Sequence, residues 1–282
     1  MTQNTFLVTG ATSGVGKALA IQLVQRGGHV IAVCRNAEKG QALREQIIKQ
    51  TQSQSIDILI ADLSSQADVK QLIKTILAKY DRLDCLINNA GSVIATKTFS
   101  VDHIEMTLAT NHLGPLQLTL GLLDLLKKST PARIINISSA IHRWARLDLT
   151  DLNYERRTYR AMKVYAQSKL LMNLTSFELA RRLTGTGVSV NCIHPGAVKT
   201  QLGSNNANSH LLKIIDRFIK FFFISAEDAA KPIVDLAFAP HDAAVTGLYF
   251  EKRKSVRASR QCYDTTLAKS AWDTSIALIG DS

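Results

Sequence analysis

Cysteines are few in this sequence, and their spacing excludes the common metal and redox motifs. Cys34, Cys85, Cys192 and Cys262 form no C-x-x-C pair, and each lies in or near an apolar stretch. We therefore expect reduced, partly buried thiols in a cytoplasmic protein, and we expect no metal site.

Long apolar runs are also absent. No stretch approaches 18 uninterrupted apolar residues, so no segment is expected to span a membrane. The N-terminus has no charged region followed by a long apolar stretch, and "TFLVTG" is instead typical of a first strand. Because the chain of 282 residues also has no internal repeat, low-complexity tract or Pro/Gly linker, a single domain is favoured.

Positive charge is in excess, with a formal net charge of +11. The basic residues gather in two segments, 143–163 and 251–260, and neither carries a recognisable nucleic-acid motif. We interpret them as solvated basic surface, with attraction of an anionic ligand as the alternative, and we expect no nucleic-acid partner.

The sequence alternates between short apolar runs and longer amphipathic segments. Seven runs rich in β-branched residues are expected to be strands, at 5–10, 29–34, 55–61, 82–88, 133–138, 188–194 and 246–250. Between them, the 3.6-residue apolar spacing of helices occurs at 14–27, 37–50, 65–80, 101–128, 160–184 and 225–239. This order predicts an α/β fold with a mostly parallel, doubly wound sheet that has helices on both faces.

A glycine-rich turn follows the first expected strand. In "TGATSGVG" the glycines permit a tight turn and close approach to a pyrophosphate, which the N–H groups at the start of the next helix stabilise. Ligands of such sheets bind beyond the carboxyl ends of the strands. The turn therefore predicts a dinucleotide site, with a purely structural turn as the alternative. Its residues are Gly10, Thr12, Ser13, Gly14, Val15 and Gly16.

The ends of the second and third expected strands indicate which dinucleotide fits. An NAD site usually has Asp or Glu at the end of the second strand, but this chain has Cys34 followed by Arg35. An arginine can bind a 2′-phosphate through charge-assisted hydrogen bonds, so the prediction is NADP(H). After the third strand, Asp62 could accept from the adenine amino group while Leu63 flanks the ring. A structural role for Asp62 near the start of the next helix is an equal alternative.

Two tyrosine–lysine pairs are spaced four residues apart, Tyr159 with Lys163 and Tyr165 with Lys169. Residues at that spacing on a helix face the same way. A free tyrosine has a pKa of about 10 and is a poor base at neutral pH, whereas a nearby ammonium, together with the positive ring of an oxidised nicotinamide, favours the phenolate and lowers the pKa. Each pair is therefore a candidate acid–base pair.

Several further motifs, taken in order, carry a resemblance to a known family. From residue 5 to about 275, the chain resembles the short-chain dehydrogenase/reductase family, and within it the retinol dehydrogenase-like branch. The resemblance implies a seven-stranded Rossmann-type fold, a nicotinamide cofactor and reversible alcohol/carbonyl chemistry. The matching stretches are "TGATSGVG", "CRNAEKG", "ADLSS", "LINNAG", "TNHLGP", "INISS", "YAQSKL", "ELARRL", "VNCIHPGAVKT" and "AKSAWDTS".

The resemblance assigns the catalytic residues. It implies that Tyr165 exchanges the proton with the substrate oxygen, while Lys169 holds the nicotinamide ribose and Ser139, rather than Ser138, hydrogen-bonds the substrate oxygen. The pair at Tyr159 lacks the serine and leucine that follow Tyr165 in "YAQSKL" and is disfavoured.

A fourth catalytic residue is expected at Asn111. Pro115 has no N–H, so the carbonyl of Asn111 loses its usual helical partner. The resemblance implies that this carbonyl holds a water in a proton relay from Tyr165 and Lys169; a helix simply broken at Gly114-Pro115 is the alternative. His112 and His194 are expected to be structural histidines.

Two more stretches are expected to line the cofactor. In "NNAG" and "HPGAVKT", small residues and a turn allow the backbone to approach the ribose and the carboxamide. The residues concerned are Asn89, Ala90, Gly91, Pro195, Gly196, Val198 and Thr200.

The irregular segments are expected to surround the substrate. The Ser139-to-Tyr165 separation is long for the family, so 140–164 is expected to hold an inserted loop. In 201–224, the stretch 208–224 would form a helix with one charged stripe, and a lid over an apolar substrate is predicted. A peripheral membrane contact, a packing element and a homo-oligomer contact are its alternatives.

The sequence thus predicts an NADP(H)-dependent oxidoreductase that interconverts an apolar alcohol and its aldehyde or ketone. The alternative is a catalytically silent nucleotide-sensing or scaffold protein on the same fold. The simultaneous presence of Asn111, Ser139, Tyr165 and Lys169 argues against that alternative.

Overall fold

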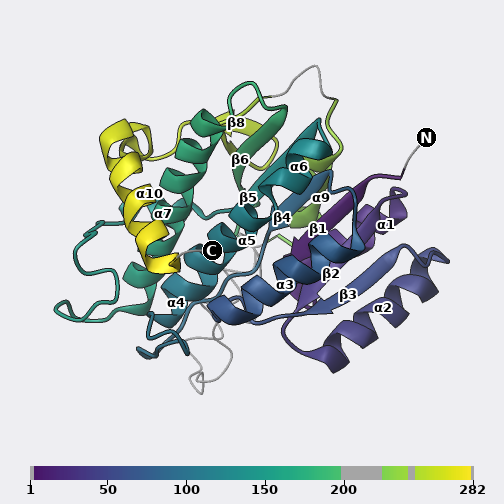
Figure 1. Cartoon of the computed structure of the whole chain (residues 1–282), viewed down its shortest axis with the longest axis horizontal. Coiled ribbons are helices and arrows are strands. Elements are labelled where there is room, and N and C mark those ends of the chain that lie inside the picture. The colour runs from purple at the N-terminus through teal and green to yellow at the C-terminus, as the bar shows by residue number, and fades with distance from the viewer. Residues whose placement is uncertain (1–2, 198–223, 241–244, 281–282) are drawn as a thin grey trace.

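The computed structural model of the protein describes residues 3–197, 224–240 and 245–280. Its centre is one eight-stranded sheet in the order β3-β2-β1-β4-β5-β6-β7-β8 (Figure 1). All neighbouring strands pair in parallel except β7 and β8, which are antiparallel. The strands are β1 (Thr5–Thr9), β2 (His29–Cys34), β3 (Ile56–Ile60), β4 (Cys85–Asn88), β5 (Ala132–Ile137), β6 (Val188–His194), β7 (Tyr249–Glu251) and β8 (Lys254–Val256).

The doubly wound parallel sheet is confirmed, but the expected number of strands is one too few. β8 is a three-residue strand that returns along β7 after a tight turn in which Lys252 has a φ of +55°. All three of its residues are at least partly exposed, so it lacks the apolar run by which a strand is found in the sequence.

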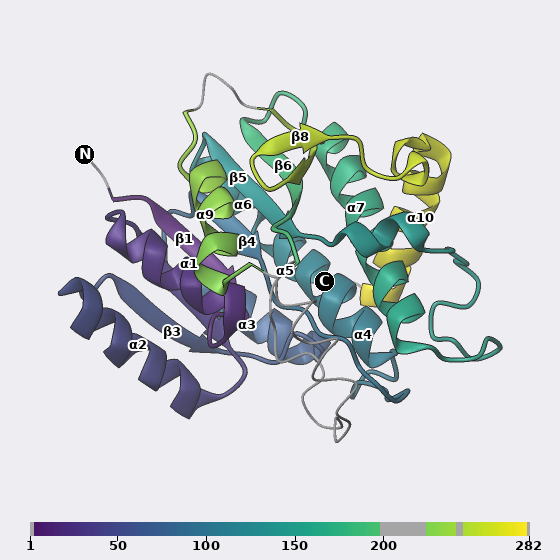
Figure 2. The same cartoon turned by 180° about the vertical axis from the view of Figure 1, so that it is seen from behind.

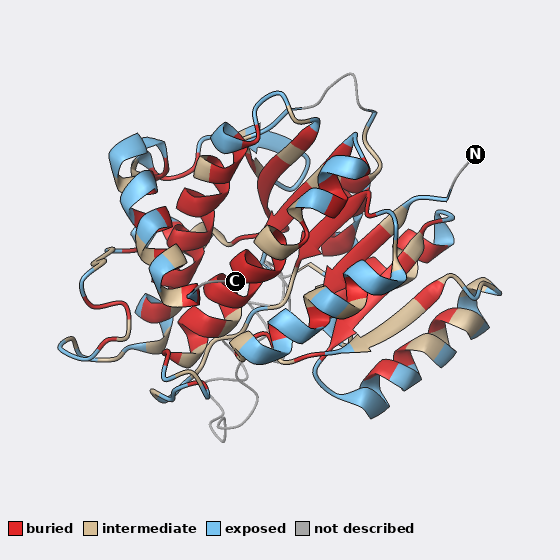
Figure 3. Cartoon of the chain, in the orientation of Figure 1, coloured by how far each residue is buried: buried red, intermediate tan, exposed pale blue. Residues whose placement is uncertain are grey.

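Helices cover both faces of the sheet, as expected. On one face, α1 (Gly14–Gln25), α2 (Ala37–Thr51) and α9 (Ala226–Ala237) bury their apolar residues against the strands (Figure 2). Along β1, Phe6 and Val8 point to this face, whereas Leu7 joins the core on the other face. This alternation follows the two-residue repeat of a strand, and it makes the central strands buried on both sides (Figure 3).

The opposite face carries the helices that lead to the functional residues. These are α3 (Gln66–Lys79), α4 (Met106–Leu108), the π-helix η1 (Ala109–Leu113), α5 (Gly114–Gly121), α6 (Leu123–Lys128), α7 (Ala161–Arg182) and α10 (Thr265–Ile279). Two short 3₁₀ helices, η2 (Ala140–Trp144) and η5 (Arg260–Tyr263), lie at the start of the inserted loop and just before α10.

Two features of this face differ from the expected helices. The segment 101–128 is not one helix. Its first helical residue is Met106, and α4 continues through the π-helix η1 into α5 and α6. In addition, α10 was not predicted, although it packs against α7 through Ala268, Ala271 and Trp272. Within the described ranges, no helix is both long and apolar enough to cross a membrane. All four cysteines are buried and unpaired.

A buried histidine connects α10 to the π turn. His112 is 2% exposed, and its Nε2 lies 2.8 Å from the hydroxyl of Ser275 in α10. Burial, together with the positive charge of Lys169, lowers its pKa from 6.5 to about 3. As expected from the sequence, His112 is therefore a structural residue that stays neutral at physiological pH.

This histidine makes stability depend on pH. Between the folded pKa and 6.5, the unfolded chain binds a proton that folded His112 does not, so its contribution is complete above pH 6.5 and declines as pH falls. At pH 5 the loss is about 2 kcal/mol of unfolding free energy, because each pKa unit corresponds to about 1.4 kcal/mol. Urea unfolding from pH 7.5 to 5 measures it. The variant His112→Gln should flatten the decline by that amount, and an equally steep decline in both proteins would contradict the assignment.

Candidate active site

The glycine-rich turn lies between the end of β1 and the start of α1. Gly10 has a φ of +65°, which a residue with a side chain rarely adopts. A Cβ added to Gly16 would lie 2.2 Å from the carbonyl oxygen of Gly10, so only glycine fits there. The side chain of Ser13, the N-cap residue, makes no capping hydrogen bond, and the first turn of α1 has no acidic residue. The cradle therefore fits an anionic group such as a pyrophosphate.

Asn89 fastens this turn to the end of β4. Its Nδ2 donates to the carbonyl oxygens of Thr9 and Gly10, at 2.8 and 3.3 Å. In return, Thr9 Oγ1 accepts from the backbone N–H groups of Asn89 and Ala90, both at 3.0 Å. Thr9 was missed in the sequence, because a threonine at the end of a strand is ordinary.

At the end of β2, the chain presents an arginine where an NAD site would have a carboxylate. Cys34 is buried, and burial raises the pKa of its thiol to about 11, so it carries no negative charge at neutral pH. Arg35 follows directly and is exposed. Asn36 begins α2, with its Oδ1 accepting from the N–H of Lys39 at 2.8 Å.

Asp62, after β3, has a partner within the chain. Its Oδ1 accepts from both the N–H and the hydroxyl of Ser64, at 2.9 and 2.8 Å, so it shapes the turn before α3. This supports the structural alternative for Asp62, while the contact with adenine stays a prediction. Leu63 is buried, and a Cβ on Gly114 would lie 2.0 Å from its carbonyl oxygen, which fixes how closely α5 approaches this turn.

Ser139, Tyr165 and Lys169 meet beyond the end of β5. Ser139 follows this strand and is the N-cap residue of η2, while Tyr165 and Lys169 lie one turn apart on α7. The hydroxyl of Ser139 interacts with the Tyr165 phenol and lowers its pKa. The Nζ atom of Lys169 lies 5.8 Å from the centre of the Tyr165 ring and donates to the carbonyl oxygen of Ile137, at 2.8 Å. Three residues chosen from the sequence are thus brought together.

Burial sets the protonation of this group in the protein's own residues. It raises the pKa of Tyr165 above 10, and the interaction with Ser139 offsets only part of that rise. Burial also lowers the pKa of Lys169 from 10.5 to about 8. The expectation that Lys169 and the oxidised nicotinamide ring together lower the pKa of Tyr165 stays a prediction, because burial of the phenol acts in the opposite direction. At neutral pH, Tyr165 is a protonated acid.

Asn111 contributes its side chain rather than only its backbone. Its Oδ1 accepts from the N–H of Ser92 at 2.8 Å, and its Nδ2 donates to the Ser92 carbonyl oxygen at 2.9 Å. The same Nδ2 reaches the hydroxyl of Ser168 at 3.1 Å, and that hydroxyl donates to the Tyr165 carbonyl oxygen at 2.8 Å. Ser92 and Ser168 were missed in the sequence, because isolated serines carry no motif.

A π turn sets the position of Asn111. The N–H of Gly114 bonds to the carbonyl oxygen of Ala109, five residues earlier, and Pro115 follows without an N–H to give Asn111. The irregular helix expected from Pro115 is therefore present. Gly91 lies between the two functional side chains, since a Cβ on it would be 3.4 Å from both Asn111 Oδ1 and Lys169 Nζ. The water at the Asn111 carbonyl stays a prediction.

The alternative pair, Tyr159 and Lys163, does not form. Tyr159 precedes α7, which begins at Ala161, so the two residues are not one helical turn apart. The hydroxyl of Tyr159 instead donates to the carbonyl oxygen of Ile94 at 2.8 Å, and Lys163 is exposed.

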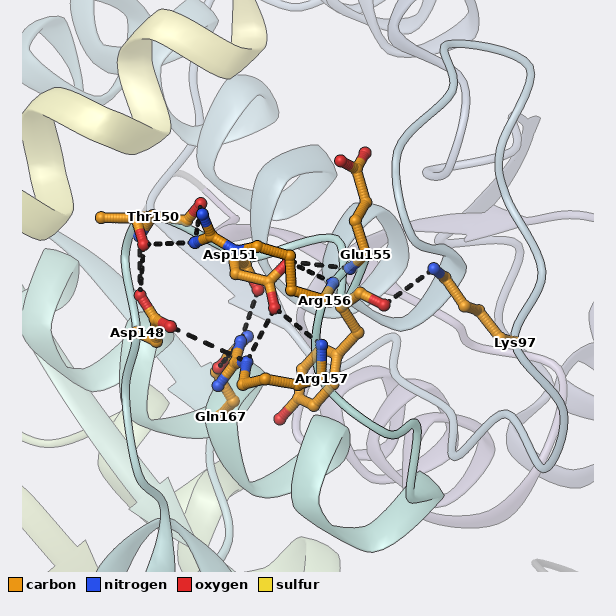
Figure 4. Close-up of polar contacts among 9 residues, drawn as sticks. Lys97, Asp148, Thr150, Asp151, Glu155, Arg156, Arg157 and Gln167 are labelled. Atoms are coloured by element: carbon orange, nitrogen blue, oxygen red, sulfur yellow. Dashed lines mark hydrogen bonds and ion pairs between the residues drawn. The ribbon is translucent and has the colours of Figure 1, made fainter.

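The expected insertion, 140–164, is partly helical. Its first residues form η2 and its last four belong to α7, which leaves 145–160 as the loop. A buried carboxylate organises it: Asp151 accepts from the backbone N–H groups of Glu155, Arg156 and Arg157 and from Nε of Arg157 (Figure 4). Arg157 also donates to Gln167 on α7, at 3.2 Å.

The loop is fastened on its other side as well. Nζ of Lys97 donates to the Tyr154 carbonyl oxygen at 2.8 Å, and the Arg157 guanidinium lies 4.1 Å from the centre of the Tyr154 ring. Asn153 accepts from the N–H of Glu105 at 3.0 Å. The insertion is therefore an ordered loop beside α7, attached both to that helix and to residues 97–105.

The conformation of the loop at 145–160 depends on Asp151. Asp151→Ala removes the acceptor of three backbone N–H groups, so the loop should open and trypsin should cleave after Arg156 or Arg157 at least about tenfold faster. Timed proteolysis followed by mass spectrometry measures this rate. Glu155→Ala is the matched control, because the Glu155 carboxylate points away from the cluster (Figure 4). Equal cleavage rates for the two variants would contradict this role.

Of the residues predicted after β6, the structure describes only the first few. Pro195 and Gly196 follow β6, and Gly196 has a φ of +112°, in agreement with a turn. Val198, Thr200 and the predicted lid, 201–224 except Ile224, lie outside the described residues. His194 is half-buried, and burial lowers its pKa below 6.5, in keeping with a neutral structural residue.

A glycine turn after β1 and a Ser–Tyr–Lys group beyond β5, on a doubly wound sheet, define a nicotinamide-dependent oxidoreductase of Rossmann type. The family follows from comparison with known proteins. The family model for short chain dehydrogenase matches residues 4–210, and the chain belongs to this family.

Relatives and solved structures agree with this. The chain is 38% identical to human retinol dehydrogenase 13, covering 98% of this chain and 84% of that protein, and 35% identical to human retinol dehydrogenase 11, covering 97% and 85%. A crystal structure of an uncharacterised protein from Mycobacterium paratuberculosis has a TM-score of 0.79 at 29% identity, covering 98% of this chain and 93% of that one. The Pseudomonas aeruginosa RhlG/NADP active-site complex has a TM-score of 0.71 at 26% identity, covering 88% and 94%.

Proposed function

We propose that this protein is an NADPH-dependent reductase of apolar aldehydes or ketones, which also catalyses the reverse oxidation of the alcohol. The observation that carries the proposal is the group formed by Ser139, Tyr165 and Lys169 next to the glycine turn. The names of the curated relatives supply the substrate class, since retinol is a largely apolar alcohol.

The residues of the site support a proton-donating role. Bound NADPH supplies the hydride. Tyr165, protonated at neutral pH, is placed to donate its proton to the oxygen that gains negative charge. The Ser139 hydroxyl can hydrogen-bond that oxygen or the Tyr165 phenolate left behind, and the buried Lys169 ammonium stabilises the phenolate. Because its pKa is about 8, Lys169 can also pass a proton on near neutral pH.

The residues also fit NADP rather than NAD. Arg35 is exposed at the end of β2, where a 2′-phosphate would lie, and the neighbouring Cys34 carries no charge. The RhlG complex, at 26% identity, is a structural relative with NADP in its site.

Tyr165 is tested by a matched pair of variants. Tyr165→Phe removes only the acidic hydroxyl, so kcat should fall by about 10²–10⁴-fold while NADPH affinity changes little. Tyr159→Phe removes the hydroxyl of the alternative tyrosine, whose partner is the Ile94 carbonyl oxygen. Its kcat should stay within a few-fold of the native value. Oxidation of NADPH at 340 nm with a panel of aldehydes, ketones and quinones measures both, and the opposite ranking would refute the assignment.

Arg35 is tested by a charge reversal. Arg35→Asp removes the hydrogen bonds to a 2′-phosphate and adds a repelling charge, so NADPH affinity should fall about 10–100-fold. NADH affinity should stay the same or improve. Titration of intrinsic fluorescence with each cofactor measures the ratio, and equal binding of NADPH and NADH by the native protein would contradict the preference.

A catalytically silent sensor is the competing function. A sensor would use the same cofactor site, so it would bind NADPH tightly but turn over no member of the carbonyl panel. That outcome, with the native protein, would replace the reductase by the sensor.

A further inference from the structure

A histidine outside the predicted site contacts the catalytic serine directly. His142 lies in η2 and is fully buried. Its Nδ1 lies 2.7 Å from the carbonyl oxygen of Ser139, which also accepts from the backbone N–H of His142 at 3.2 Å. On the other side of the ring, the backbone N–H of Ser259 points at Nε2, at 3.0 Å.

These two partners fix the tautomer of His142. A carbonyl oxygen can only accept, so Nδ1 carries the proton; a backbone N–H can only donate, so Nε2 offers its lone pair. One neutral form satisfies both contacts. The ring packs against Tyr249 of β7, with the ring centres 4.9 Å apart.

The His142 bridge, from the Ser139 carbonyl to the Ser259 N–H, constrains the orientation of Ser139. Ser139 has extended backbone angles, φ −147° and ψ 146°, and Ser138 before it is bonded to β6 through its N–H and the Ile193 carbonyl oxygen, at 2.8 Å. With the Ser139 carbonyl held by His142, the direction of the Cα–Cβ bond is set. The Ser139 hydroxyl oxygen accepts from the N–H of Ile141 at 3.5 Å, and the hydroxyl lowers the pKa of Tyr165.

We propose that His142 is a positioning residue: as the neutral Nδ1–H tautomer, it joins the Ser139 carbonyl to the Ser259 N–H and so holds the Ser139 hydroxyl toward Tyr165. The segment between β8 and η5 thereby becomes part of the active-site framework. The effect on turnover rests on the proposed function, whereas the tautomer does not.

The surroundings keep this form stable. Burial lowers the pKa of His142 below 6.5, and the positive charge of Arg143 on the same helix lowers it further, against the opposing effect of the Ser139 carbonyl. A protonated ring would place an Nε2–H against the N–H of Ser259, two donors facing each other.

Two substitutions separate the two contacts. The side-chain amide of Asn reaches the position of Nδ1, and that of Gln reaches the position of Nε2. His142→Asn therefore keeps the donor to Ser139 and loses the contact with Ser259, while His142→Gln does the reverse. His142→Asn leaves the buried N–H of Ser259 without an acceptor, whereas in His142→Gln the Ser139 carbonyl keeps the backbone N–H of residue 142, so His142→Gln should lose no more thermal stability than His142→Asn.

The kinetic result should differ between them. We expect kcat of His142→Gln to be at least about tenfold below that of His142→Asn, with the same NADPH affinity in both, because only the first loses the side-chain donor to the Ser139 carbonyl. Equal losses of kcat in both variants, following their melting temperatures, would show a purely structural role and overturn the proposal.

The tautomer is measured without any turnover. In protein labelled with ¹⁵N-histidine, one of the seven histidines should show a protonated Nδ1 and a bare Nε2 from pH 5.5 to 8, and its signals should vanish in both variants. A protonated Nε2, or titration near 6.5, would overturn the bridge. If the native protein turns over no carbonyl substrate, the proposed reduction fails, and the nitrogen shifts still decide whether the bridge exists.

Discussion

Parallel strand pairing is the constraint on which the site depends. Because β1, β2, β4, β5 and β6 run in the same direction and in register, their carboxyl ends meet at one edge of the sheet. The glycine turn, Arg35, Asn89 and Ser139 all follow those ends. Residues more than a hundred positions apart thus come together without any contact that had to be encoded pair by pair.

A second set of contacts makes this edge rigid. Asn89 holds the glycine turn, Asn111 holds Ser92 and α7, and Lys169 holds the end of β5. Every one of these side chains is polar and at least partly buried, and each binds backbone groups that would otherwise lose their hydrogen bonds with water. The polar groups that prepare the site for chemistry are therefore also the ones that close the loops around it.

Much of this could be predicted from the sequence, for reasons that differ between residues. The parallel strands were found because apolar runs buried on both sides stand out. Tyr165 and Lys169 were found from their helical spacing, and the family resemblance selected this pair and added Ser139. The antiparallel β8 and helix α10 were missed: the first has no apolar run, and the second buries only a narrow stripe, made of Ala268, Ala271, Trp272, Ser275 and Ile279. The pKa of Tyr165 also depends on burial in three dimensions, which the spacing to Lys169 does not reveal. Thr9, Ser92 and His142 act through backbone groups, which no motif records.

The π turn at Ala109–Leu113 has a consequence for how this helix can change over evolution. A π turn is equivalent to one extra residue in an α-helix, and one residue corresponds to a rotation of about 100° around the helix axis. Leu108 and Leu113, on either side of Asn111 in the chain, remain in the core, while Asn111 bonds to Ser92 and Ser168. Deletion of a single residue here would restore a regular helix and leave the apolar packing on one side of the deletion out of phase with Asn111. An insertion or deletion here would thus disturb the site more than most substitutions, and the length of this segment is as much a part of the site as the identity of any side chain in it.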